Sequence, residues 1–189
     1  MGAAAQAQAP RFEAGVQASV IDIRSLAEKP VLGGGRATVR FWRPLAAEVE
    51  VNRWPVGGVT SNYSATQVFI GLRAGRKFGP FGLYGKLRPG FVSFDTNQYL
   101  ADLGKQAALD IGGVLVIYSG WHITTRFDFG DTVIWYGSTF GRLPTGSIVL
   151  PLGTQHQYQA SIGFGVWFCF EGTAERGSAA SAGVPMPAR

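Results

Sequence analysis

The chain has 189 residues, of which 46% are hydrophobic and only 15% are charged, and its formal net charge is +5. No run approaches the roughly 20 consecutive apolar residues of a membrane-spanning helix, and the cations are scattered instead of forming the stripe that nucleic-acid-binding proteins carry. The one cysteine, Cys169, excludes an intramolecular disulfide framework.

The 27 glycines and the 13% of aromatic residues favour an all-β chain with many turns and close backbone contacts. Apolar and polar residues alternate over eight segments, and this period of two places successive side chains on opposite faces of a strand. The alternation covers residues 12–20, 36–41, 45–52, 67–75, 81–91, 109–117, 123–129 and 157–168.

The first four segments follow one scheme. In the first, Phe12 and Val16 share an apolar face, while Glu13 and Gln17 lie on the polar face. The fifth segment contains Pro89, which cannot donate to a strand ladder, so we expect a bulge there. In the sixth, Val114 and Val116 blur the polar face, and the last two segments alternate cleanly again.

The connections alternate strictly between short and long. The short ones are residues 42–44, 79–80 and 119–120, and the long ones are 24–35, 55–64, 95–106 and 137–155. An up-and-down membrane barrel has this pattern, with short periplasmic turns and longer outer loops. A Greek-key sandwich is not expected to sort its loops in this way. The glycines at positions 33–35 are assigned to the end of the first long loop, since no Lys-Ser/Thr pair marks a phosphate-binding loop.

Aromatic residues gather at both ends of the predicted strands, where membrane barrels carry girdles at the level of the lipid headgroups. The predicted interface aromatics are Trp42, Trp54, Phe78, Phe81, Tyr118, Trp121, Trp135, Tyr136, Tyr158, Phe168 and Phe170.

Alternation alone does not say which face is inside. The interior of an eight-stranded barrel is just wide enough to be filled by side chains, and opposite charges in near-equal number can pair there. We therefore expect the apolar face to meet lipid and the lumen to hold a charge network. Its predicted members are Glu13, Arg36, Arg40, Glu48, Glu50, Arg73, Lys86, Arg88, Asp110, Arg126 and Asp128. The alternative is a soluble lipocalin-like barrel with a small ligand inside.

Four segments carry a family resemblance: residues 12–17 (FEAGVQ), 85–91 (GKLRPGF), 127–132 (FDFGDT) and 161–168 (SIGFGVWF). Through them the chain resembles the small OmpA/OmpX-like outer-membrane β-barrel domains. The resemblance implies an eight-stranded antiparallel up-and-down transmembrane β-barrel in the outer membrane of a Gram-negative bacterium. It also implies periplasmic termini and insertion by the outer-membrane assembly machinery.

The predicted barrel covers residues 12–170. Residues 1–11 are interpreted as a signal-peptide remnant or a disordered N-terminus, because Ala5-Gln6-Ala7 has the form of a cleavage site but no apolar segment precedes it. Residues 171–189 are rich in Ala, Gly, Ser and Pro and are expected to be a disordered tail.

No residue set points to catalysis or to a metal. His156 and Ser161 fall on opposite faces of one strand, as do Asp128 and Asp131, and no His, Cys and carboxylate cluster has metal-ligand spacing. We expect no enzymatic activity and no cofactor. The predicted role is structural or interactive, with outer loops that contact lipopolysaccharide, other lipid or a protein partner, and with the C-terminal tail as a second contact. A small lipid-modifying enzyme or transporter is the other alternative.

Overall fold

A computed structural model describes residues 12–22, 31–42, 44–54, 64–94, 104–119, 122–137, 139–143, 146–150 and 153–168. Ten strands lie within these ranges: β1 (Phe12–Ile21), β2 (Val31–Arg40), β3 (Leu45–Trp54), β4 (Ala65–Phe78), β5 (Phe81–Phe94), β6 (Lys105–Ser119), β7 (Ile123–Trp135), β8 (Thr139–Leu143), β9 (Gly146–Leu150) and β10 (Thr154–Phe168). The described part of the chain holds no helix long and apolar enough to cross a membrane. The predicted leader and tail, residues 1–11 and 171–189, fall outside the described ranges.

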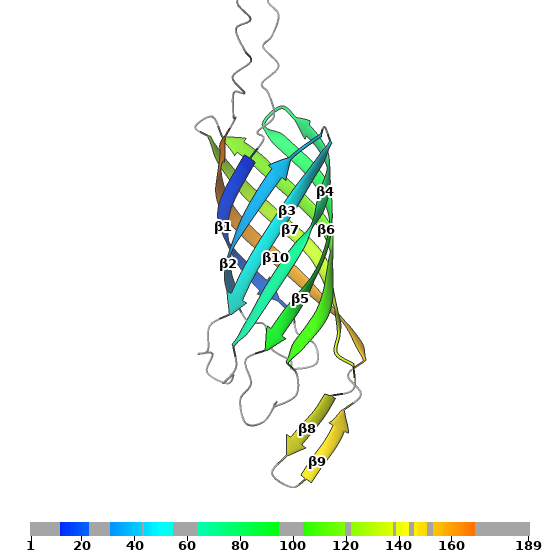
Figure 1. Cartoon of the computed structure of the whole chain (residues 1–189). Coiled ribbons are helices and arrows are strands. Elements are labelled where there is room, and N and C mark those ends of the chain that lie inside the picture. Colours follow the sequence, from blue (N-terminus) through cyan, green and yellow to red (C-terminus); the bar gives the residue numbers. More distant parts are fainter. Residues whose placement is uncertain are drawn as a thin grey trace, which may run out of the picture.

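Eight of the strands close into a barrel in the order β1-β10-β7-β6-β5-β4-β3-β2 (Figure 1). All neighbouring pairs are antiparallel. Apart from β8 and β9, each strand lies beside the strands that precede and follow it in the chain. The structure thus confirms the eight-stranded up-and-down barrel that the alternation predicts.

The strands β8 and β9 form a separate two-stranded sheet inside the longest predicted connection. Figure 1 shows this hairpin beyond the end of the barrel that is opposite the start of β1. The hairpin was not predicted, because five-residue strands are too short for alternation to be recognised. We call its end of the barrel the long-loop end, and the end where β1 begins and where β4 turns into β5 the short-turn end.

The register fixes the slant of the strands. Successive paired residues round the barrel are Phe12, Val39, Ala47, Leu72, Leu87, Ile111, Asp131 and Tyr158. The carbonyl of Tyr158 then accepts the amide of Asp22, so the path returns to β1 ten residues beyond its start, from position 12 to position 22. This stagger over eight strands corresponds to a tilt of roughly 40° and leaves an interior wide enough only for side chains.

Inward and outward side chains alternate along every barrel strand. In β5, Tyr84, Lys86 and Arg88 are buried, whereas Leu83 and Leu87 are exposed. Charged and polar residues therefore occupy the middle of the interior, and most of the large apolar residues lie on the exterior. A lipocalin-like barrel requires the opposite arrangement, so that alternative is not favoured.

The predicted loop assignment of Gly33, Gly34 and Gly35 is wrong. These glycines lie within β2 and are in register with both β1 and β3. The three glycines interrupt the alternation of apolar and polar residues in the sequence. Their backbone nevertheless continues the β1–β2 and β2–β3 pairings.

The predicted bulge at Pro89 is also wrong. The β4–β5 register is the same on both sides of this proline, with Leu72 opposite Leu87 and Phe69 opposite Gly90, so no residue is inserted. The pairing omits only the two positions between them, which accommodates the missing N–H of Pro89.

Gly112 shows how closely the strands approach in the wall. A Cβ atom at this position would lie 2.0 Å from the carbonyl oxygen of Phe129 on β7. At the next residue, Gly113, the nearest atom would be 3.9 Å away. Only the first of these two neighbouring glycines is therefore required by packing.

Candidate functional site in the barrel lumen

Charged side chains from strands β1 to β7 fill the middle of the lumen. Of the eleven charged residues predicted there, ten are at most 5% exposed: Glu13, Arg36, Glu48, Glu50, Arg73, Lys86, Arg88, Asp110, Arg126 and Asp128. The eleventh, Arg40, is partly exposed at the short-turn end of β2. Each occupies one of the alternate strand positions, here called inward parity, whose side chains point into the lumen. Residues from seven strands therefore converge there.

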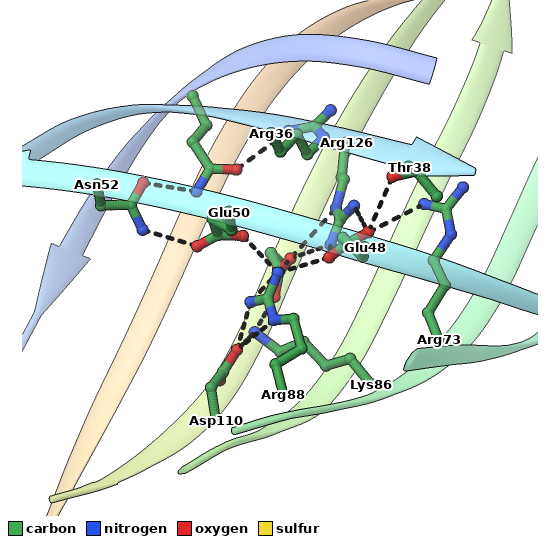
Figure 2. Close-up of polar contacts among 12 residues, drawn as sticks. Arg36, Thr38, Glu48, Glu50, Asn52, Arg73, Lys86, Arg88, Asp110 and Arg126 are labelled. Carbon is green, nitrogen blue, oxygen red and sulfur yellow. Dashed lines mark hydrogen bonds and ion pairs between the residues drawn. The ribbon is translucent and has the colours of Figure 1, made fainter. Parts of the chain in front are cut away.

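Glu48 on β3 lies at the centre of this network (Figure 2). Its carboxylate accepts two hydrogen bonds from Arg126, Nη1 to Oε2 at 2.5 Å and Nη2 to Oε1 at 2.7 Å. Arg88 Nη1 donates to Oε1 at 2.5 Å, and the Thr38 hydroxyl donates to Oε2 at 3.1 Å. Four donors thus converge on the two oxygens of one carboxylate, which has about four lone-pair sites.

Three further acids join the network through Arg88 and Lys86. Arg88 forms ion pairs with Glu50 and Asp110. Lys86 Nζ lies 2.9 Å from Asp110 Oδ2 and also contacts Asp128. These contacts connect β3, β5, β6 and β7 across the lumen.

A second group surrounds Glu13 nearer the short-turn end. Its carboxylate accepts hydrogen bonds from Arg73 Nη2 at 3.1 Å and from the Thr124 hydroxyl at 3.2 Å. Arg36 Nη2 lies 3.5 Å from its Oε1. Arg73 Nη1 also lies 3.7 Å from Glu48 Oε2, so the two groups of charges are continuous.

Neutral side chains complete the circuit. Arg36 Nη1 donates to Gln17 Oε1 at 3.2 Å, Gln17 Nε2 donates to Asn52 Oδ1 at 2.9 Å, and Asn52 Nδ2 donates to Glu50 Oε1 at 2.7 Å. This chain of hydrogen bonds links the Glu13 group to Glu50 by a second route.

The ten buried charges are five cations and five anions. Burying an unpaired charge is costly, and the cost is offset only where opposite charges and additional hydrogen bonds surround it. The balance therefore explains how so many ionised groups share a narrow lumen. Chemically, the arrangement acts as a neutral cross-link between strands that are distant in the chain.

Apolar clusters lie inside the barrel on both sides of the charged zone. The cluster toward the long-loop end is Ile21, Leu32, Ala65, Phe69, Val92, Phe94, Ala108, Ile134 and Tyr136. The cluster toward the short-turn end is Tyr84, Val114, Val116 and Tyr118, with Trp167 packed against it. Sequence analysis placed Val114 and Val116 on the polar face but identified neither cluster, because it expected charged side chains to fill the lumen. Parity could have found them, since Phe69 shares the parity of Gln67 and Arg73.

Six of the predicted interface aromatics are exposed on the outside of the barrel. They are Trp42, Phe78, Phe81 and Phe168 at the short-turn end, and Trp135 and Tyr158 at the long-loop end. Trp121, Phe170 and the side chain of Trp54 lie outside the described residues.

The interface assignment is wrong for Tyr118 and Tyr136, which are buried in the lumen. The hydroxyl of Tyr118 lies 2.9 Å from that of Tyr84, and Tyr136 accepts a hydrogen bond from Gln157 at 2.8 Å. The prediction for both residues rests on their closeness to a strand end. Closeness to a strand end determines how far along the barrel axis a residue lies. Its position in the inward and outward alternation determines whether its side chain faces the lumen or the outside.

One group of acids among the described residues has the spacing of metal ligands. Oxygens of Glu48, Glu50 and Asp128 lie within 4.8 Å of one another. Arg88 and Arg126 already bind these carboxylates from within the lumen. The arrangement therefore fits guanidinium groups, and we assign no metal to it.

His156 forms a hydrogen-bonded pair with Asp131 on the outer wall, with its Nδ1 2.6 Å from Asp131 Oδ2. Sequence reasoning missed this pair because it joins β10 to β7. Asp128 and Asp131 lie on opposite faces, as predicted.

No family model and no curated protein matches the chain in sequence. The fold is similar to that of Neisserial surface protein A, at 14% identity and a TM-score of 0.55, covering 83% of this chain and 96% of that one. It is equally similar to the outer membrane protein OprG from Pseudomonas aeruginosa, at 14% identity and a TM-score of 0.55, covering 83% and 95%. The barrel fold implied by the sequence resemblance is thus confirmed.

Proposed function

We propose that this protein is an integral outer-membrane β-barrel with periplasmic termini, a closed lumen and a structural or interactive role. The observation that carries the proposal is the inverted distribution of its side chains. Charged residues are buried in the lumen, while large apolar residues such as Ile70, Leu83 and Phe129 are each about 60% exposed on the wall.

The dimensions of the wall support a location in lipid. At a tilt of roughly 40°, a ten-residue strand such as β1 rises about 25 Å along the barrel axis, which matches the apolar band of membrane barrels. The six exposed aromatics then form two interface rows, with Trp42, Phe78, Phe81 and Phe168 in the periplasmic row. Closure of the barrel also leaves no strand edge exposed to hydrocarbon.

The proposed task of the charge network is to close the lumen and hold the strands together. Glu48, Arg88 and Arg126 cross the lumen in the middle, and apolar clusters lie above and below them. Water and ions would have to displace ion pairs as well as apolar contacts in order to pass. We therefore propose that the barrel does not conduct.

The surface available for interaction lies at the long-loop end. The hairpin β8–β9 is separate from the barrel sheet and thus does not serve closure. We propose that this hairpin and the neighbouring loops contact lipopolysaccharide or a protein partner, and that the assembly machinery recognises the closing strand β10. The name of one structural neighbour, Neisserial surface protein A, is consistent with a surface role.

The first experiment is extraction of outer membranes in mild detergent, followed by comparison of the gel mobility of boiled and unboiled samples. A detergent-dependent species that shifts on boiling supports the proposal. Recovery in the aqueous fraction contradicts it. Reconstitution into planar bilayers tests closure, because steady conductance through single barrels would contradict a sealed lumen.

A further inference from the structure

The inward-facing charges of the described strands do not balance once the two cations at the short-turn end are included. The ten buried charges cancel, and Arg40 and Lys77, both partly exposed, add two cations. Arg40 contacts Tyr84, whose hydroxyl accepts a hydrogen bond from its Nη2 at 3.1 Å and whose ring centroid lies 6.0 Å from its guanidinium carbon. No carboxylate of the described residues pairs with it.

Two nearby arginines have donors that no group of the described chain accepts. Arg36 and Arg73 have side chains that are 1% and 3% exposed. The unpartnered nitrogens are Nε and Nη2 of Arg36 and Nε and Nη1 of Arg73. The carboxylate oxygens nearest the two Nη atoms lie at 3.5 and 3.7 Å, too far to accept good hydrogen bonds.

Of the two neighbouring acids, Glu48 has no capacity left to accept these donors, because it already receives four hydrogen bonds. Glu13 receives two, from Arg73 and Thr124, but its Oε1 stays 3.5 Å from Nη2 of Arg36. Buried donors require acceptors, and an uncompensated buried charge requires a counter-charge. A water molecule supplies only an acceptor, whereas an anion supplies both.

A series of cations and hydroxyls leads from the short-turn end to the unpartnered donors of Arg36 and Arg73. Lys77 Nζ lies 4.5 Å from the centroid of the Tyr118 ring, and the Tyr118 hydroxyl lies 2.9 Å from that of Tyr84. The guanidinium carbon of Arg73 lies 4.7 Å from the centroid of the Tyr84 ring. Lys77, Arg40 and Arg73 thus form a series that enters the lumen past two tyrosines.

We propose that the lumen binds one small monovalent inorganic anion, such as chloride, at Arg36 and Arg73, and that the anion enters from the short-turn end. The packed lumen selects a small ion over a bulky oxyanion. Arg40 and Lys77 position the site electrostatically, because theirs are the charges that the buried acids leave uncompensated. The site goes beyond the proposed function and requires only the closed barrel.

The test is diffraction from protein refolded in sodium bromide, measured at the bromine absorption edge. We expect an anomalous peak within hydrogen-bond reach of Arg36 and Arg73. The peak should be absent in the double variant Arg40→Gln with Lys77→Gln, which makes the inward charges equal in number. It should persist in the control Arg76→Gln, which removes a cation from the outer wall at the same end. Bromide found only on the outer surface, as an adventitious ion only, or a peak unchanged in the double variant would overturn the proposal.

A second measurement does not require crystals. The temperature of the gel-mobility shift is compared in chloride and in isethionate at equal ionic strength, because isethionate is too large for the lumen. The unmodified protein and Arg76→Gln should convert at a higher temperature in chloride, and the double variant Arg40→Gln with Lys77→Gln should show no difference. Equal conversion temperatures of the unmodified protein in both salts would also overturn the proposal.

Discussion

Glu48→Gln keeps the length of the central side chain of the lumen but removes its charge. The carboxylate accepts two hydrogen bonds from Arg126 and one from Arg88, and all three residues are at most 1% exposed. Removing one partner of a buried ion pair costs about 3–5 kcal/mol, because the remaining charge stays buried. We expect the free energy of unfolding to fall by that amount.

The free energy of unfolding is measured by urea titration in lipid vesicles, with tryptophan fluorescence and gel mobility as the two readouts. The matched control is Asp131→Asn, which makes the same acid-to-amide change in the exposed pair with His156. An exposed pair contributes about 0–1 kcal/mol. The difference between the two variants therefore isolates the effect of burial.

Equal losses in Glu48→Gln and Asp131→Asn would refute the reasoning. The double variant Glu48→Gln with Arg126→Met provides a further check, because it removes both partners and leaves no unpaired charge between them. We expect its loss of stability to be smaller than the sum of the two single losses. Simple additivity would indicate that the two side chains are not coupled.

The other predictions concern the wall and the loops. Phe129→Arg places a cation midway along the outward face of β7 and should cost about 2–4 kcal/mol in a bilayer, whereas Ile123→Arg at the strand end should cost about 0–1 kcal/mol; equal costs in vesicle unfolding would argue against a lipid-facing wall. Gly112→Ala should destabilise the barrel by roughly 1–3 kcal/mol, because the new Cβ meets the Phe129 carbonyl, and Gly113→Ala should be tolerated in the same urea titration. Replacing residues 139–150 by a short Gly-Ser linker should leave the heat-dependent mobility shift intact, since β8 and β9 pair only with each other; loss of the shift would show that the hairpin is needed for assembly.

Much of the fold could be predicted from local pattern. Alternation in segments such as residues 157–168 identified strands and faces, because successive side chains must point to opposite sides. The alternation of short and long connections identified the up-and-down order. The glycines at positions 33–35 and Pro89 were misjudged, since their effect depends on whether the neighbouring strand tolerates them.

The aromatic residues show a second limit of local reasoning. Tyr118 and Tyr136 lie at strand ends, and this placed them in the predicted interface rows. Tyr118 lies an even number of residues from Asp110, an inward residue of β6, and Tyr136, directly after β7, lies an even number of residues from the inward Thr132. For these two tyrosines, the alternation in the sequence indicates the lumen correctly, whereas closeness to a turn indicates the wrong face.

The sequence by itself determined that the chain forms eight alternating strands and which residues share a face, because both follow from a period of two. The register between the strands decided which of the inward-facing side chains meet. Glu48 meets Arg88 and Arg126, which are 40 and 78 residues away, only because the barrel closes with a stagger of ten residues. Closure also made the interior narrow enough for these side chains to touch across it. Pairing between distant charges is a property of that geometry, and no local pattern encodes it.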